Sequence, residues 1–163
     1  MRNIDQITIR PAREADAAGI AAITRELGWL PHQAGESFDC TEERARQQLA
    51  LVQTGDCHMV MVAETESGEI AGFASWHWLP SLVLDGLEGY MSELFVRKDD
   101  RGRGLGRAIL EAIKSQARSR GCSRLMLLNG RHRESYVRGF YKNSGWLERP
   151  EIANFVCPLS KTE

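Results

Sequence analysis

A short segment rich in glycine and arginine is the part of the sequence best suited to bind an anion. It consists of Arg101, Gly102, Arg103, Gly104, Leu105, Gly106 and Arg107. Helical periodicity begins at Leu105, so the glycines lead into the first turn of a helix. Backbone N–H groups at that end lack intrahelical acceptors and carry partial positive charge, and glycine lets phosphate oxygens approach them closely. The segment therefore predicts a phosphate or pyrophosphate site, and the alternative is a solvated turn with surface arginines.

Glu93 and His77 are ionisable side chains in otherwise apolar segments. Half-burial would raise the pKa of the Glu93 carboxylate and let it accept a proton near neutral pH. Its alternatives are an ion pair with an arginine and a solvent-facing carboxylate. Glu88 is a weaker rival for the same role. His77 lies between two tryptophans, and a histidine on a half-buried strand is more often a packed residue than a base.

The anion-binding segment and the strand before it resemble the motif of a known superfamily. The glycines are followed by no Gly-Lys-Ser/Thr and lack the Gly-x-Gly-x-x-Gly spacing, so they form neither a P-loop nor a dinucleotide motif. Residues 92–96, SELFV, and residues 101–106, RGRGLG, are instead similar to the strand and the Gln/Arg-x-x-Gly-x-Gly/Ala loop of the GNAT N-acetyltransferases. Residues 140–146, FYKNSGW, resemble the family's later Phe-Tyr-x-x-x-Gly-Phe segment, with Trp146 as a departure.

This resemblance implies a site for acetyl-CoA. The backbone of Leu94, Phe95 and Val96 is expected to pair with the pantetheine arm as if it were an added strand. The N–H groups from Arg101 to Arg107 are expected to bind the pyrophosphate. Asn129 lies where the family often contacts the pantetheine, although Asn-Gly is also a common turn pair.

The resemblance also makes Tyr141 the candidate general acid. A leaving thiolate needs a proton, and a phenol with an ordinary pKa near 10 can donate one to a sulfur whose thiol titrates near 8.5. The alternative is a core residue, because Tyr141 shares a helical stripe with Val137 and Phe140. Glu93 would take the proton that an ammonium must lose before it attacks.

The function implied is direct transfer of an acetyl group from acetyl-CoA to a primary amine of a small molecule. Two alternatives stay open: a non-catalytic acyl-CoA-binding regulatory module, and a protein or peptide N-acetyltransferase. No metal site is expected, because the four cysteines have no paired spacing. A homodimer is compatible with the family.

The sequence shows both the two-residue periodicity of strands and the 3.6-residue periodicity of helices, and these elements must position the residues above. Strands are expected at residues 7–10, 57–63, 70–79, 90–96, 123–128 and 152–159. Helices are expected between Pro11 and Gly28, from an N-cap at Thr41 to Gly55, from Leu105 to Gly121, and over residues 134–144. The loop 66–69 should close a β-hairpin, and residues 90–96 should be covered on both faces. The fold class is α/β: a GNAT-like mixed central sheet with a parallel strand-helix-strand crossover and helices on both faces.

Length and composition limit the remaining possibilities. A chain of 163 residues, 42% hydrophobic and 26% charged, predicts a single domain over residues 1–163. A net charge of −1 argues against a nucleic-acid partner. No apolar run approaches the ~18 residues of a membrane span, and the first residues carry no apolar leader, so a cytoplasmic protein without a membrane partner is expected.

Overall fold

The computed structural model describes residues 7–28 and 35–159. The chain forms two compact units, Met1–Leu128 and Asn129–Glu163. The first unit contains the sheet and the longer helices, and the second contains, among its described residues, two short helical segments at residues 134–137 and 142–144. The single domain expected over residues 1–163 stays a prediction.

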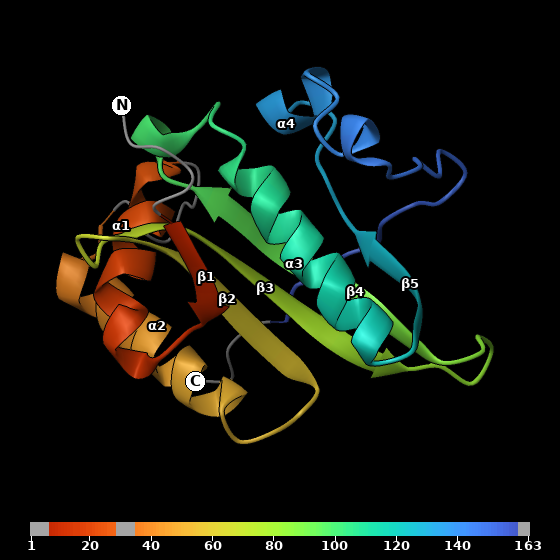
Figure 1. Ribbon diagram of the computed structural model, residues 1–163, viewed down its shortest axis with the longest axis horizontal. Coiled ribbons are helices and arrows are strands. Elements are labelled where there is room, and N and C mark those ends of the chain that lie inside the picture. The colour runs from red at the N-terminus through yellow and green to blue at the C-terminus, as the bar shows by residue number, and fades with distance from the viewer. Residues whose placement is uncertain (1–6, 29–34, 160–163) are drawn as a thin grey trace. The chain divides into compact units, whose positions relative to one another are not determined.

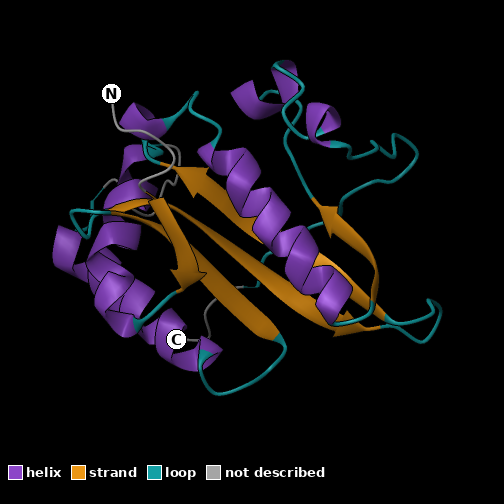
Figure 2. Cartoon of the chain, viewed as in Figure 1, coloured by secondary structure: helices purple, strands orange, loops and turns teal. Residues whose placement is uncertain are grey.

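One mixed sheet forms the centre of the first unit (Figure 1, Figure 2). Its strands are β1 Ile7–Pro11, β2 His58–Thr65, β3 Ile70–Pro80, β4 Leu87–Val96 and β5 Cys122–Leu127. They lie in the order β1-β2-β3-β4-β5, with β4 and β5 parallel and the other neighbours antiparallel. The predicted hairpin, the parallel crossover and the α/β fold class are therefore confirmed. Strand β4 begins three residues earlier than the predicted Tyr90.

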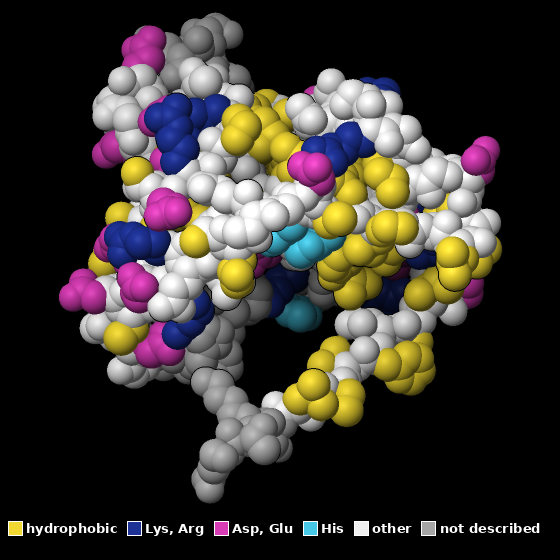
Figure 3. Space-filling model, turned by 90° about the horizontal axis from the view of Figure 1, so that it is seen from below, with side chains coloured by type: hydrophobic (Ala, Val, Ile, Leu, Met, Phe, Trp, Pro, Cys, Tyr) yellow, Lys and Arg dark blue, Asp and Glu magenta, His cyan; other side chains and the backbone are white. Residues whose placement is uncertain are grey.

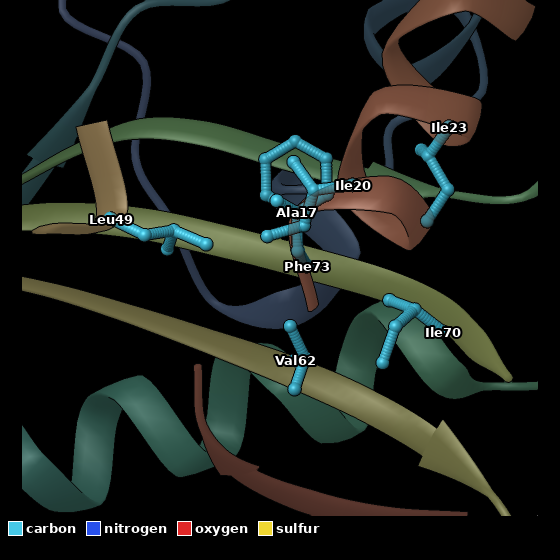
Figure 4. Close-up of a cluster of buried hydrophobic side chains, with 7 residues drawn as sticks. All are labelled: Ala17, Ile20, Ile23, Leu49, Val62, Ile70 and Phe73. Atoms are coloured by element: carbon cyan, nitrogen blue, oxygen red, sulfur yellow. The ribbon is translucent and has the colours of Figure 1, made fainter. Parts of the chain in front are cut away.

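Helices α1 (Ala17–Glu26) and α2 (Phe38–Val52) cover one face of this sheet. Figure 4 shows the apolar side chains that join them to β2 and β3: Ala17, Ile20, Ile23, Leu49, Val62, Ile70 and Phe73. Side chains alternate between the two faces along a strand, so Ser75 and His77 follow Phe73 on this same face. The apolar cluster ends at Phe73, which leaves polar residues beyond it.

Helix α3 (Leu105–Ser119) lies across the opposite face (Figure 1). Its buried residues recur at helical spacing and are Leu105, Ile109, Leu110, Ile113 and Ala117. A Cβ atom on Gly72 would meet Ile109 Cδ1 at 3.4 Å, which places Gly72 against this helix. Trp76 and Trp78 share the face of Gly72 by alternation, and both are buried. Helices therefore cover both faces, as predicted.

Helix α2 starts before the N-cap that the sequence suggested. Ser37 is the N-cap, and its hydroxyl accepts a hydrogen bond from the Cys40 N–H at 3.3 Å. Thr41 lies inside the helix, where its hydroxyl accepts from Arg25 Nη1 at 3.1 Å. The prediction of Thr41 as N-cap is therefore wrong, because a serine upstream satisfies the same orphan donors. Residues 29–34, which precede this helix, lie outside the described residues.

An ion pair joins β1 to the start of α1. Asp16 is only 7% exposed and accepts from Arg10 Nη1 and Nη2 at 2.7 and 2.8 Å and from the Arg13 N–H at 2.7 Å. Burial alone would raise the pKa of Asp16, but the hydrogen bonds and charges of Arg10 and Arg13 bring it below its ordinary value. The carboxylate therefore stabilises the folded state while it is ionised.

We expect Asp16→Ala to lower the free energy of unfolding by about 3 kcal/mol at neutral pH, because it leaves Arg10 without its buried partner. A carboxylate whose folded pKa is depressed contributes fully above its unfolded pKa and loses that contribution as pH falls through the folded pKa. The difference from wild type should therefore shrink below about pH 4. Urea denaturation at pH 7 and pH 2 measures it. Glu64→Ala is the matched control; Glu64 is the more exposed partner of Arg10, and its loss should cost clearly less than the loss of Asp16.

The second unit departs from the predicted helix over residues 134–144. Helix α4 covers only Glu134–Val137, and a 3-10 turn covers Lys142–Ser144. Between them Gly139 has a φ of +67°, which ends the helix because left-handed backbone cannot continue right-handed turns. The prediction of one helix over residues 134–144 is therefore wrong, because the apolar spacing on which it was based continues past Gly139, where the helix has already ended.

The strand predicted over residues 152–159 is also wrong. The structure assigns no strand to these described residues, and Phe155 and Leu159 are 91% and 88% exposed. An alternating pattern says which side chains would share a face, but a strand also needs a neighbouring strand to pair with.

None of the described helices is long and apolar enough to cross a bilayer.

Candidate active site

The glycine-rich segment forms an open turn at the start of α3. Gly102 and Gly104 have φ values of +75° and +85°, a backbone region that side chains other than glycine rarely adopt. Gly104 is the N-cap, and the first intrahelical bond runs from the Ala108 N–H to the Gly104 carbonyl at 3.0 Å. The N–H groups of Leu105 and Gly106 precede that bond and lie at the positive end of the helix. This geometry suits an anion.

A buried carboxylate anchors the turn. Asp100 is 3% exposed and accepts from Arg97 Nε at 2.7 Å and from Arg103 Nη1 at 3.5 Å. The Arg101 side chain folds back, and its Nε donates to the Val96 carbonyl at 3.0 Å. These arginines fix the path from β4 to α3 in addition to supplying positive charge.

Strands β4 and β5 part just before this turn. Their ladder runs from Leu87 beside Cys122 to Met91 beside Leu127 and ends there, although β4 continues to Val96. The register between β3 and β4 also shifts at this point: Ser75 lies opposite Glu93 and Trp76 opposite Met91, so Ser92 is an extra residue. Such a bulge increases local twist, which turns the end of β4 away from its neighbour. Leu94, Phe95 and Val96 lie beyond the last β4–β5 pair.

Glu93 lies at the parting of the two strands. Its side chain reaches solvent, so the prediction that residues 90–96 are covered on both faces is wrong at Ser92 and Glu93. The protein around Glu93 nevertheless limits its hydration, and this burial raises the pKa of its carboxyl group; a hydrogen bond from Ser75 opposes the shift without cancelling it. The result is an accessible carboxylate that is a stronger base than an ordinary glutamate.

Two histidines and a buried serine lie on the same face as Glu93. His58 Nε2 is 2.7 Å from Ser75 Oγ, and the rings of His58 and His77 stack with centroids 4.0 Å apart. Burial lowers the pKa of both histidines, and the charge of His77 lowers that of His58 further. Histidine side chains reach the surface in Figure 3. The sequence drew attention only to His77, because the pairing of three strands is what places Ser75 opposite Glu93 and His58 next to Ser75 and His77.

Glu88 has a different environment from Glu93. It forms an ion pair with Arg124 on the neighbouring strand β5. The guanidinium of Arg124 therefore occupies the Glu88 carboxylate, the weaker rival of Glu93 for the role of base.

The second unit contains Asn129 and Tyr141. Asn129 Oδ1 accepts from the Ser135 hydroxyl at 3.2 Å, while its Nδ2 is buried without a hydrogen-bond partner among the described residues. The half-buried Tyr141 ring packs edge-on against Phe140 and Trp146, with centroids 4.9 and 6.1 Å away. Burial raises the pKa of Tyr141 to about 12, so the phenol stays protonated at neutral pH.

Comparison with known proteins places the chain in one family. The model of the acetyltransferase (GNAT) family matches residues 23–146, more than half of the chain. The aminoglycoside N(6')-acetyltransferase type 1 of Stenotrophomonas maltophilia is 30% identical over 156 residues, which cover 93% of this chain and 94% of that protein. Glucosamine 6-phosphate N-acetyltransferase 1 of Oryza sativa subsp. japonica is 29% identical over 86% of this chain and 81% of its own length.

The fold itself recurs in solved structures. A transcriptional regulator from Bacillus halodurans C-125 superimposes with a TM-score of 0.80 at 18% identity, covering 94% of this chain and 99% of that one. At 18% identity this similarity supports only the fold assignment. It agrees with the sheet order and the parallel crossover described above. The matched family model and the long alignment to a 30% identical relative carry the assignment. The chain therefore belongs to the acetyltransferase (GNAT) family.

Proposed function

We propose that this chain is an N-acetyltransferase that moves an acetyl group from acetyl-CoA to a primary amine of a small molecule by direct transfer. Membership of the family supports the reaction class. Relatives named for aminoglycosides and for glucosamine 6-phosphate support a small amine as acceptor. The observation that carries the proposal is the accessible, raised-pKa carboxylate of Glu93 at the point where β4 and β5 part.

Three features of the chain fit acetyl-CoA. The end of β4 beyond Met91 has the extended backbone that an amide-containing pantetheine arm can pair with. The turn at Gly102 and Gly104 leads into the positive end of α3, which suits a pyrophosphate; a Cβ atom built on Gly102 would meet nothing within 4 Å. The buried Nδ2 of Asn129 is a donor that a pantetheine carbonyl would satisfy.

Two residues of the chain, Glu93 and Tyr141, would then assist the removal of the amine proton and the departure of the thiolate. When bound, acetyl-CoA supplies an activated thioester. Glu93 would accept the proton that the ammonium loses, since its raised pKa brings it closer to that of an amine. With a pKa of about 12, Tyr141 is a weaker acid than a thiol, so its contribution would be a hydrogen bond to the leaving sulfur rather than complete proton transfer.

Release of free thiol from acetyl-CoA tests the proposed function. The full-length protein is offered alkylamines, polyamines, aminoglycosides, amino acids and peptides, and the thiol is followed with a colorimetric reagent. Faster release with a small amine is expected. Binding of acetyl-CoA with no acceleration by any amine would favour the regulatory module, and acceleration by peptides alone would favour a peptide N-acetyltransferase.

We expect Tyr141→Phe to lower kcat about tenfold and to change the Kd for acetyl-CoA by less than about twofold. The variant removes one hydrogen-bond donor and keeps the ring that packs on Phe140 and Trp146. Steady-state kinetics and calorimetry measure the two effects. Phe140→Leu, which alters the neighbouring ring without touching the phenol, is the packing control. An unchanged kcat, with chemistry shown to be rate-limiting, would return Tyr141 to a core role.

A further inference from the structure

A buried hydroxyl lies between Glu93 and a histidine two strands away. Ser75 on β3 is 3% exposed, and its Oγ lies 2.7 Å from Nε2 of His58 on β2. Ser75 is also directly opposite Glu93 on β4, so the two side chains are neighbours on the same face of the sheet. His58 itself is half-buried at the start of its strand. The three polar groups therefore lie next to one another on three adjacent strands, from the accessible carboxylate to a ring that reaches solvent elsewhere.

Ser75 has the hydrogen-bonding capacity that such a path requires. A hydroxyl donates one hydrogen bond and accepts two. The single proton of the Ser92 hydroxyl has three acceptors within reach: the Ser75 carbonyl at 3.2 Å, Ser75 Oγ at 3.3 Å and His77 Nε2 at 3.4 Å. Even when Ser92 donates to Ser75 Oγ, that oxygen keeps one acceptor position and its own proton for Glu93 and His58. Buried serines more often satisfy their hydroxyl on nearby backbone, whereas Ser75 lies between two ionisable side chains.

We propose that Ser75 and His58 carry away the proton that Glu93 receives from the amine. This inference rests on the proposed function. The protonated carboxyl of Glu93 donates its proton to Ser75 Oγ while Ser75 passes its own proton to Nε2 of a neutral His58, and the imidazolium then loses its Nδ1 proton to water. Glu93 is left ionised. His58 is left protonated on Nε2 and returns to its Nδ1–H tautomer by proton exchange with water before the next turnover, so no oxidant or further reactant takes part. Ser75 and His58 act through Glu93 and are positioning residues.

The groups around His58 keep its ring neutral between turnovers. The ring of His77 from β3 stacks on the ring of His58. The ring of Tyr90 from β4 stacks in turn on that of His77, with ring centroids 6.2 Å apart. Asp56 precedes the strand, and Arg120 at the end of α3 donates to the Asp56 carbonyl at 3.0 Å. Two stacked imidazoles resist a second positive charge, because like charges at this distance repel. A neutral ring offers the lone pair that Ser75 needs.

Removal of the hydroxyl tests the path. Ser75→Ala should lower kcat about tenfold with the best amine of the thiol-release panel and leave the KM for acetyl-CoA within about twofold. Ser75→Thr keeps the hydroxyl and should restore most of the rate. Ser92→Ala, which removes a neighbouring hydroxyl beside the path, should lose much less. Equal losses in Ser75→Ala and Ser92→Ala, or no loss in Ser75→Ala, would overturn the inference; melting curves confirm that each variant is folded.

Chemical rescue separates proton transfer from packing. His58→Ala should be as slow as Ser75→Ala, and added imidazoles should restore the rate in proportion to their basicity. Rescue that follows the size of the added ring and ignores its pKa would assign His58 a purely structural role. If the wild-type protein turns over and both variants have normal rates, the proton path through Ser75 and His58 is wrong and the proposed function stands. If the wild-type protein turns over no amine, both the proposed function and the path are wrong.

An NMR titration of the ligand-free protein gives a readout independent of activity. The ring shifts of His58 should show a second, smaller inflection as Glu93 ionises, because the shared hydroxyl reorients when the carboxylate loses its proton. Ser75→Ala and Glu93→Gln should each remove that inflection and leave the main titration of His77 in place. A His58 titration with one inflection in wild type, identical to that in Ser75→Ala, would show that the groups are not coupled and would overturn the inference.

Discussion

Gly104→Glu is expected to weaken acetyl-CoA binding by at least about 100-fold, or roughly 2.7 kcal/mol, and to leave the sheet and α3 folded. Gly104 is the N-cap of α3 with a φ of +85°, at the positive end of the helix where the pyrophosphate is proposed to lie. A glutamate there adds bulk and a negative charge where an anion must enter. Titration calorimetry measures the affinity, and thermal melting monitors the fold.

A matched variant separates charge from backbone strain. Gly104→Gln introduces a side chain of the same size and the same strained backbone without the charge. It should bind acetyl-CoA more weakly than wild type but clearly more tightly than Gly104→Glu. Equal affinities for the two variants would attribute the loss to strain. A folded Gly104→Glu protein with wild-type affinity would remove this turn from the cofactor site.

Glu93→Gln should lower kcat by about 10²–10³-fold at neutral pH, because glutamine keeps the size of the side chain but cannot accept the ammonium proton. The deficit should shrink as pH approaches the pKa of the amine, near 10.4 for an alkyl amine, since the acceptor then arrives already neutral. The acid limb of the wild-type profile should lie above the ordinary range of a glutamate, because burial raises the pKa of Glu93. Measured kcat and kcat/KM across pH test these expectations.

Stability and binding provide the controls for Glu93→Gln. A carboxyl whose folded pKa is raised binds its proton more tightly in the folded state, so the ionised form costs stability as pH rises above the unfolded pKa. The melting temperature of Glu93→Gln at neutral pH should therefore equal or exceed that of wild type. A raised KM for the amine with an unchanged kcat would indicate electrostatic attraction of the ammonium. Superimposable pH profiles would return the role of base to His77, Glu88 or ordered water.

Local sequence was sufficient to predict the glycine-rich turn and the elements around it. Residues 101–106 place glycine where the backbone needs a positive φ, as at Gly102 and Gly104. The apolar stripe after them predicted α3, and the residues of the hairpin turn predicted the β2–β3 pairing. In each case the signal and the structure lie within a few neighbouring residues, where backbone preference and periodicity act directly.

Local patterns failed where a single residue or a missing neighbour decided the outcome. The apolar spacing of residues 134–144 suggested one helix, but the positive φ of Gly139 ended it after one turn. The alternation over residues 152–159 suggested a strand, and no described strand forms there, because pairing depends on residues that periodicity does not identify.

Only the tertiary structure decided the surroundings of Glu93. The sequence by itself determined that a carboxylate interrupts an apolar strand ahead of an anion-binding turn. The register of β2, β3 and β4 placed Ser75 opposite it and His58 next to Ser75, and the bulge at Ser92 together with the early end of the β4–β5 ladder left it accessible. Register is a property of several strands packing at once, and a shift of one residue would move each of these side chains to the opposite face.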